Sequence, residues 1–107
     1  MVHGGVFITG AASGIGRAWA LRLAKKNYGI TVVDLDLEGA EKTVDMIKAM
    51  GGQAQSIKCD LTSYVDQKHA FEAHIREFST LDFAILNAGV PEQGDFLDPQ
   101  NHSWIFP

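Results

Sequence analysis

The chain has 107 residues, of which 46% are hydrophobic, and its formal net charge is −4. A chain of this length and composition can form one small domain with a real core, which excludes a disordered protein. Because the charge is modestly negative and no block of like charges occurs, we expect neither nucleic acid nor a membrane surface as a partner.

Three features bear on the cell compartment. No apolar run approaches the roughly 20 residues that span a bilayer, and the first five residues carry no charged leader. The single cysteine, Cys59, cannot form an internal disulfide, which fits a reducing compartment. We therefore expect a soluble, cytoplasmic protein.

Strand and helix patterns alternate along the chain without repeats or an obvious linker. The predicted strands are residues 6–9, 30–34, 54–59 and 81–86. The first two predicted helices are residues 14 to about 27 and residues 37–50. Ser63 followed by Asp66 resembles a capping box, which predicts the start of a third helix. The residues predicted to face the core are Ile15, Ala18, Trp19 and Leu23 in the first helix, Ala40, Val44 and Ile47 in the second, and Phe71, Ile75 and Phe78 in the third.

This alternation predicts an α/β fold of the Rossmann-like type, with three layers and a partial parallel sheet. Right-handed crossovers place the second and third strands on one side of the first strand and the fourth strand on the other. The expected strand order is therefore 3-2-1-4, and a ligand crevice is expected where that order reverses.

A glycine-rich loop lies between the first strand and the first helix. Gly10 allows the chain to turn off the strand, Gly14 allows backbone N–H groups to approach a pyrophosphate, and Gly16 allows the helix to lie close to the strand. The positive end of the helix then faces the phosphate charge. The residues of the loop predicted to bind an adenine dinucleotide are Gly10, Ala12, Ser13, Gly14, Ile15 and Gly16.

A carboxylate, Asp34, ends the second strand about 20 residues after the loop, where the adenosine ribose is expected. It would accept hydrogen bonds from the ribose hydroxyls and repel a 2′-phosphate, so NAD is expected in preference to NADP. Ser13 is not basic, and neither neighbour of Asp34 is Arg or Lys. The structural alternatives are a turn that happens to be rich in glycine, and Asp34 as a helix N-cap.

The ends of the third and fourth strands add further candidates to the same rim. Asp60 could bond the adenine edge or its surrounding loop, and Asn87, Ala88 and Gly89 are small residues where backbone must approach a ribose. The structural alternatives are a turn that leads into the next helix and a tight loop, respectively.

These motifs resemble the N-terminal half of the short-chain dehydrogenase/reductase family. The loop of residues 9–16 resembles that family's Thr-Gly-x-x-x-Gly-x-Gly motif, and Asp34 takes the place of its NAD-selecting acid. Residues 59–62, Cys-Asp-Leu-Thr, resemble the segment in which the Asp and the following residue contact adenine, which implies a role for Asp60 and Leu61. Residues 87–89 resemble the Asn-Ala-Gly motif after the fourth strand.

The resemblance implies hydride transfer between nicotinamide and an alcohol or carbonyl carbon, with a Ser, a Tyr and a Lys as catalytic residues. In the family these three residues lie beyond the Asn-Ala-Gly motif, so we expect no catalytic residue in this chain and no turnover by it alone. Tyr64 and Lys68 have the family's Tyr-x-x-x-Lys spacing but lie on the helix before the fourth strand, which is the wrong place. We expect no metal site, because the four histidines share no helical face or cluster.

The expected domains are an NAD-binding half-domain, residues 1–90, and an irregular tail, residues 91–107, in place of the family's next helix. Trp104 resembles a family Trp that precedes that helix, but Pro107 disfavours helical geometry at Phe106, which suggests a truncated gene product or altered transcript. The alternatives left open are a non-catalytic binding module that self-associates through the exposed edge of the fourth strand, a nonfunctional truncation, and a methyl-donor cofactor on a similar loop.

Overall fold

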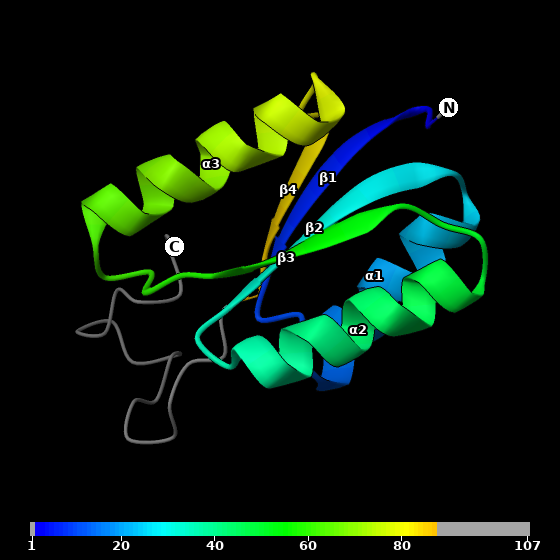
Figure 1. The fold of residues 1–107 in the computed structure, drawn as a ribbon, viewed down its shortest axis with the longest axis horizontal. Helices are drawn as coiled ribbons and strands as arrows, with labels where there is room; N and C mark the ends of the chain where they lie inside the picture. Colours follow the sequence, from blue (N-terminus) through cyan, green and yellow to red (C-terminus); the bar gives the residue numbers. More distant parts are fainter. Residues whose placement is uncertain (1, 88–107) are drawn as a thin grey trace, which may run out of the picture.

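The structure, a computed structural model, describes residues 2–87. They form a parallel sheet of four strands with the order β3-β2-β1-β4, as the sequence predicts (Figure 1). The strands are β1 (Gly4–Thr9), β2 (Tyr28–Asp34), β3 (Ala54–Lys58) and β4 (Phe83–Leu86), and the helices are α1 (Gly14–Lys25), α2 (Leu37–Ala49) and α3 (Tyr64–Phe78). No helix in this part of the chain is long and apolar enough to cross a membrane.

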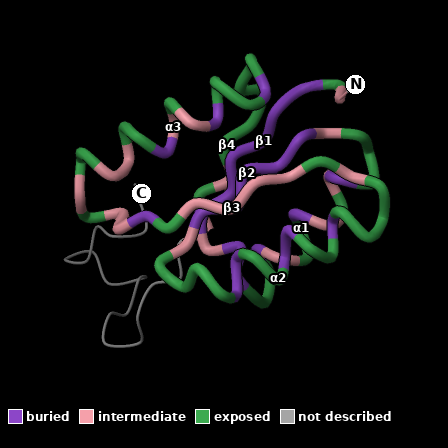
Figure 2. The backbone as a smooth tube through the Cα atoms, viewed as in Figure 1, coloured by how far each residue is buried: buried purple, intermediate pink, exposed green. Residues whose placement is uncertain are grey.

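The helices lie in two layers on either side of the sheet. Helices α1 and α2 cover one face and α3 covers the other, which completes the three layers (Figure 1). Burial is greatest along β1 and β2 in the middle of the sheet, whereas β3 and β4 are only partly covered (Figure 2). On β4, one of the two edge strands of the described sheet, Phe83 is 51% and Leu86 is 46% exposed.

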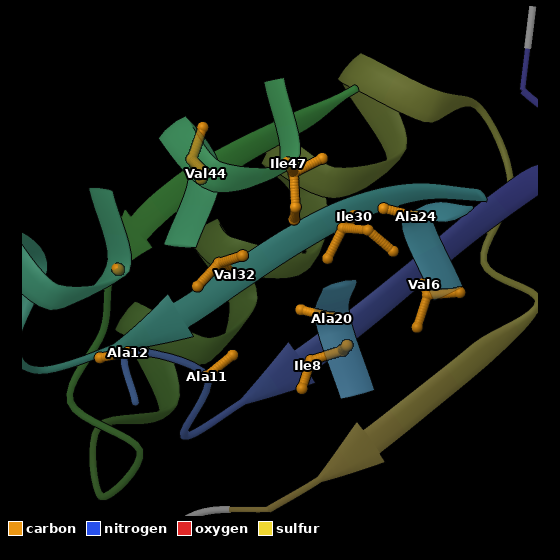
Figure 3. Close-up of a cluster of buried hydrophobic side chains, with 11 residues drawn as sticks. Val6, Ile8, Ala11, Ala12, Ala20, Ala24, Ile30, Val32, Val44 and Ile47 are labelled. Atoms are coloured by element: carbon orange, nitrogen blue, oxygen red, sulfur yellow. The ribbon is translucent and has the colours of Figure 1, made fainter. Parts of the chain in front are cut away.

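The larger core lies between the sheet and the pair α1 and α2 (Figure 3). Alternate residues of β1 and β2 point to this face, as strand geometry requires. They pack on small residues of α1 and on the apolar stripe of α2; the buried set includes Val6, Ile8, Ile30, Val32, Ala20, Ala24, Ala40, Val44 and Ile47. The predicted inner face of α2 is therefore confirmed.

The predicted inner face of α1 is wrong. The buried residues of this helix are Gly16, Ala20 and Ala24, spaced four apart, whereas Ile15 is 70% and Trp19 is 44% exposed. Ala18 is exposed as well, and Leu23 is only partly buried. Small residues permit the helix axis to approach the sheet closely, so van der Waals packing favours the Gly and Ala stripe over the larger side chains.

The smaller core lies between α3 and the other face of the sheet. Phe7 of β1 stacks on Phe71 of α3 with ring centroids 4.1 Å apart, and Phe78 is buried at the end of the helix. Ile75, predicted to face inward, is 47% exposed, and His74 takes the buried place instead. Residues 70, 74 and 78 repeat every four positions, so they form the inner stripe and Ile75 lies beside it.

His74 is a fully buried histidine whose two ring nitrogens bond to β2 and to the loop after α3. Its Nε2 lies 2.9 Å from the carbonyl oxygen of Thr80, and its Nδ1 lies 2.6 Å from Oγ1 of Thr31 on β2. Because a carbonyl only accepts, Nε2 carries the proton, and Nδ1 accepts from the Thr31 hydroxyl. This arrangement fits the neutral ring, and burial lowers the pKa of His74 below its ordinary value of 6.5.

The buried imidazole predicts a loss of stability in mild acid. The unfolded chain gains the proton near its ordinary pKa, whereas the folded chain resists it. The stability due to neutral His74 is therefore present above pH 6.5 and is lost as the pH falls through the lower folded pKa. Over that range the free energy of unfolding should fall more steeply in the unmutated chain than in His74→Gln, by at most about 1.4 kcal/mol per pH unit.

Urea unfolding at a series of pH values measures this difference. His69→Gln, at an exposed position of the same helix, is the matched control for the loss of an imidazole. Equal pH dependence for His74→Gln and the unmutated chain would show that this ring does not titrate with unfolding.

Candidate functional site

The register of the sheet brings the predicted site residues to one rim. Thr9 is paired with Val33 on one side and with Leu86 on the other, so Gly10, Asp34 and Asn87 each follow directly after a row of paired residues. Asp34 is itself paired with Lys58, and Asp60 follows two residues later. The rim is therefore built from the carboxyl ends of all four strands, where ligands of open α/β sheets bind.

The glycine loop has the backbone geometry that its function would require. Gly10 and Gly14 adopt positive φ angles of 68° and 59°, and the Gly10 N–H donates to the carbonyl of Val33 at 2.9 Å. A Cβ at Gly14 would meet nothing within 4 Å, so the loop opens to free space at this point. Ser13 and Ile15 on either side are exposed as well.

Gly16 lies close to Gly10, the first glycine of the loop, and to Asn87. A Cβ at this position would lie 2.2 Å from the carbonyl oxygen of Gly10 and 2.8 Å from Nδ2 of Asn87. Nδ2 of Asn87 in turn donates to that same carbonyl at 3.4 Å. Glycine at position 16 therefore lets the first turn of α1 approach both the loop and the end of β4.

The carboxylate of Asp34 is oriented by two backbone amides. Its Oδ2 accepts from the N–H of Ala12 at 3.2 Å, and its Oδ1 accepts from the N–H of Asp36 at 3.0 Å. An ionised carboxylate has about four acceptor positions, so capacity remains for the two hydroxyls of a ribose. Asp34 is not a helix N-cap: that role belongs to Asp36, whose Oδ1 accepts from the N–H of Gly39 at 3.0 Å.

Asp60 organises the turn that leads into α3. Its Oδ1 accepts from both the N–H and the Oγ1 hydroxyl of Thr62, at 2.9 and 2.7 Å, and these bonds lower the pKa of Asp60. Leu61 is partly buried against the smaller core. This geometry agrees with the structural alternative for Asp60, and contact of Asp60 or Leu61 with adenine stays a prediction.

Several predicted features lie outside the described residues. Ala88, Gly89, Trp104 and the whole tail of residues 91–107 are among them. Tyr64 is 76% exposed in the first turn of α3, and Lys68 is exposed one turn later. Between residues 2 and 87, no group of three or more His, Cys, Asp or Glu side chains could hold a metal ion.

Sequence reasoning missed Arg17 and Thr43, which join the glycine loop to α2. Nε of Arg17 donates to Oγ1 of Thr43 at 2.8 Å, and its NH2 group donates to the carbonyls of Ala12 and Gly39. A signal existed, because a cation in the first turn of a helix opposes the helix dipole and needs compensating partners. Thr43 also lies inside the apolar stripe of α2, where a buried hydroxyl requires a hydrogen bond.

Known proteins resemble this chain in sequence and fold. A family model described as short chain dehydrogenase matches residues 5–105. The cyclohexanol dehydrogenase of Acinetobacter sp. is 43% identical over 83 residues, which cover 78% of this chain and 33% of that protein. The hydroxysteroid dehydrogenase from Escherichia coli matches with a TM-score of 0.80 and 31% identity, over 83% of this chain and 38% of that one.

A further solved structure, the 3-ketoacyl-(acyl-carrier-protein) reductase from Brucella melitensis, is complexed with NADH. It matches with a TM-score of 0.71 and 32% identity, over 78% of this chain and 33% of that one. The present chain thus spans between 33% and 38% of the length of these three proteins.

Proposed function

Because the chain belongs to the short-chain dehydrogenase family, we propose that the rim around Gly14 and Asp34 binds NAD. The observation that carries this proposal is the pairing of an oriented carboxylate with an open, positive-φ glycine at the start of α1. The pyrophosphate would lie over Gly14 and the backbone N–H groups of the exposed residues Ser13 and Ile15, and the adenosine ribose would bond to Asp34. The NADH complex of the Brucella reductase supports a nicotinamide cofactor.

The preference for NAD over NADP rests on the charges around the ribose site. The Asp34 carboxylate would repel a 2′-phosphate and gain hydrogen bonds from free hydroxyls. Arg17 is the cation bonded to this loop, and its guanidinium is engaged with the oxygens of Ala12, Gly39 and Thr43. These hydrogen bonds use the guanidinium to hold the loop and α2 together, so we do not assign it to a 2′-phosphate on the ribose.

For the whole protein we propose oxidoreductase chemistry of the family's kind. NAD, when bound, supplies the nicotinamide that accepts or donates hydride. The role proposed for residues 10–16, Asp34 and Asn87 is to bind and orient the cofactor at the rim that the ends of the strands form. Tyr64 and Lys68 have no part in this proposal. Self-association through the edge of β4, where Phe83 and Leu86 are exposed, stays a prediction.

Titration calorimetry of the full chain with NAD tests the proposal against the alternative of a methyl-donor cofactor. We expect heat of binding with NAD and with ADP-ribose, which shares its adenosine and pyrophosphate, and none with S-adenosylmethionine, which has no pyrophosphate for the loop to hold. Binding of S-adenosylmethionine in place of NAD would overturn the proposed function.

A further inference from the structure

Arg17 and Thr43 form a hydrogen-bonded unit behind the glycine loop. Thr43 is fully buried on α2, and its Oγ1 lies 2.7 Å from the carbonyl oxygen of Ala11, to which it donates. The same hydroxyl accepts from Nε of Arg17 at 2.8 Å. Arg17 also donates to the carbonyl of Ala12, so two consecutive loop carbonyls are held by two side chains.

The hydrogen bonds to these two carbonyls also fix the directions of the N–H groups that follow them in the loop. In a planar trans peptide, a carbonyl and the following N–H point in opposite directions. The Ala11 carbonyl faces Thr43, so the Ala12 N–H faces the other way, where it donates to Oδ2 of Asp34 at 3.2 Å. The Ala12 carbonyl faces Arg17, and the N–H of the exposed Ser13 therefore faces away from the guanidinium.

The positive charge of Arg17 also favours an anion bound at the loop. In the hydrogen bonds of this unit the guanidinium donates only to neutral oxygens, which do not cancel its charge. A cation beside the N-terminus of α1 is unfavourable in the free protein, because the helix dipole is positive there. An anionic group bound at the loop would relieve that repulsion.

We infer that Arg17 and Thr43 are positioning residues for the cofactor: they hold the carbonyls of Ala11 and Ala12 so that the Ser13 N–H meets the pyrophosphate and the Asp34 carboxylate meets the ribose. This inference rests on the proposed function, because the pyrophosphate and ribose are those of NAD. It adds two residues on the far side of the loop from the proposed ligand.

Two pairs of variants in the full chain test the inference. Thr43→Val removes the hydroxyl at nearly constant shape, and Thr43→Ser restores it; Arg17→Met removes the charge, and Arg17→Lys restores it without the forked donors. Thr43→Val should weaken NAD and ADP-ribose binding roughly tenfold, as expected for the loss of a buried hydrogen-bonded group, and Thr43→Ser should recover most of that loss. Arg17→Lys should recover only part of the loss in Arg17→Met, because lysine cannot reach several oxygens in a fixed fork.

A second readout separates positioning from general destabilisation. In the ligand-free chain, Thr43→Val should shift the amide resonances of Ala12 and Ser13 and leave that of Ala70, in the core on the other side of the sheet, unchanged. Unchanged NAD affinity in Thr43→Val, or equal losses in Thr43→Val and Thr43→Ser, would overturn the inference and leave the proposed function intact. Failure of the unmutated chain to bind NAD would overturn both.

Discussion

Replacing Gly14 with valine is expected to abolish NAD binding, with a loss of affinity of at least about 100-fold. Gly14 has a φ angle of 59°, and the space beside its Cα is open. A valine there places its methyl groups where the proposal puts the pyrophosphate. The positive φ angle also strains a β-branched residue, which costs roughly 1–2 kcal/mol of stability.

Gly51 supplies a matched control for the strain. It also has a positive φ angle, 85°, and a Cβ there would likewise meet nothing within 4 Å, but it lies after α2 at the opposite end of β3 from Asp60. Gly51→Val should therefore lose a similar amount of stability in a thermal melt and keep its affinity for NAD. NAD affinity that survives Gly14→Val, measured by titration calorimetry, would remove this loop from the site.

Asp34→Ala is expected to narrow the gap between the affinities for NAD and for NADP. Two charge-assisted hydrogen bonds to ribose hydroxyls are lost, which should weaken NAD binding on the order of 10- to 100-fold. Removal of the carboxylate also removes the repulsion of a 2′-phosphate, so NADP should bind more tightly than it does to the unmutated chain. Calorimetric titrations of both cofactors at one fixed salt concentration measure the two affinities.

Asp36→Ala controls for the general effect of losing an acid near the loop. Asp36 lies two residues after Asp34 and caps α2, so its loss should cost about 1 kcal/mol of stability and leave the cofactor preference unchanged. If Asp36→Ala changed the ratio of NAD to NADP affinity as much as Asp34→Ala did, the selectivity would come from the summed charge of the region and not from Asp34.

The sheet and its strand order could be predicted because they follow from local patterns and from a handedness rule. Apolar runs alternate with helical periodicity along the chain, and right-handed crossovers together with the glycine loop after the first strand favour the order 3-2-1-4. The positions of Gly10 and Asp34 at the strand ends follow from the same alternation. What α1 and α3 bury could not be predicted as well, because hydrophobicity ranks Trp19 and Ile75 above Ala20 and His74.

Two factors decide which residues α1 and α3 bury: the distance between the helix and the sheet, and the polar partners within reach of a buried side chain. A helix that lies close to the sheet buries Gly and Ala, and a buried His is favoured where a hydroxyl and a carbonyl are both in reach of its ring. Arg17 was missed for a related reason. Its partners on α2, Gly39 and Thr43, lie 22 and 26 residues away along the chain, so no local sequence pattern connects them with the loop.

Assignment of the amide resonances that move when NAD is added to the full chain tests the central claim most directly. Binding at the proposed rim should shift the amides of Ser13, Gly14 and Asp34, and leave those of Arg76 and Glu77, exposed near the end of α3, in place. Shifts confined to α3, or no shifts when NAD is added in large excess over the chain, would contradict the assignment of this rim as the cofactor site.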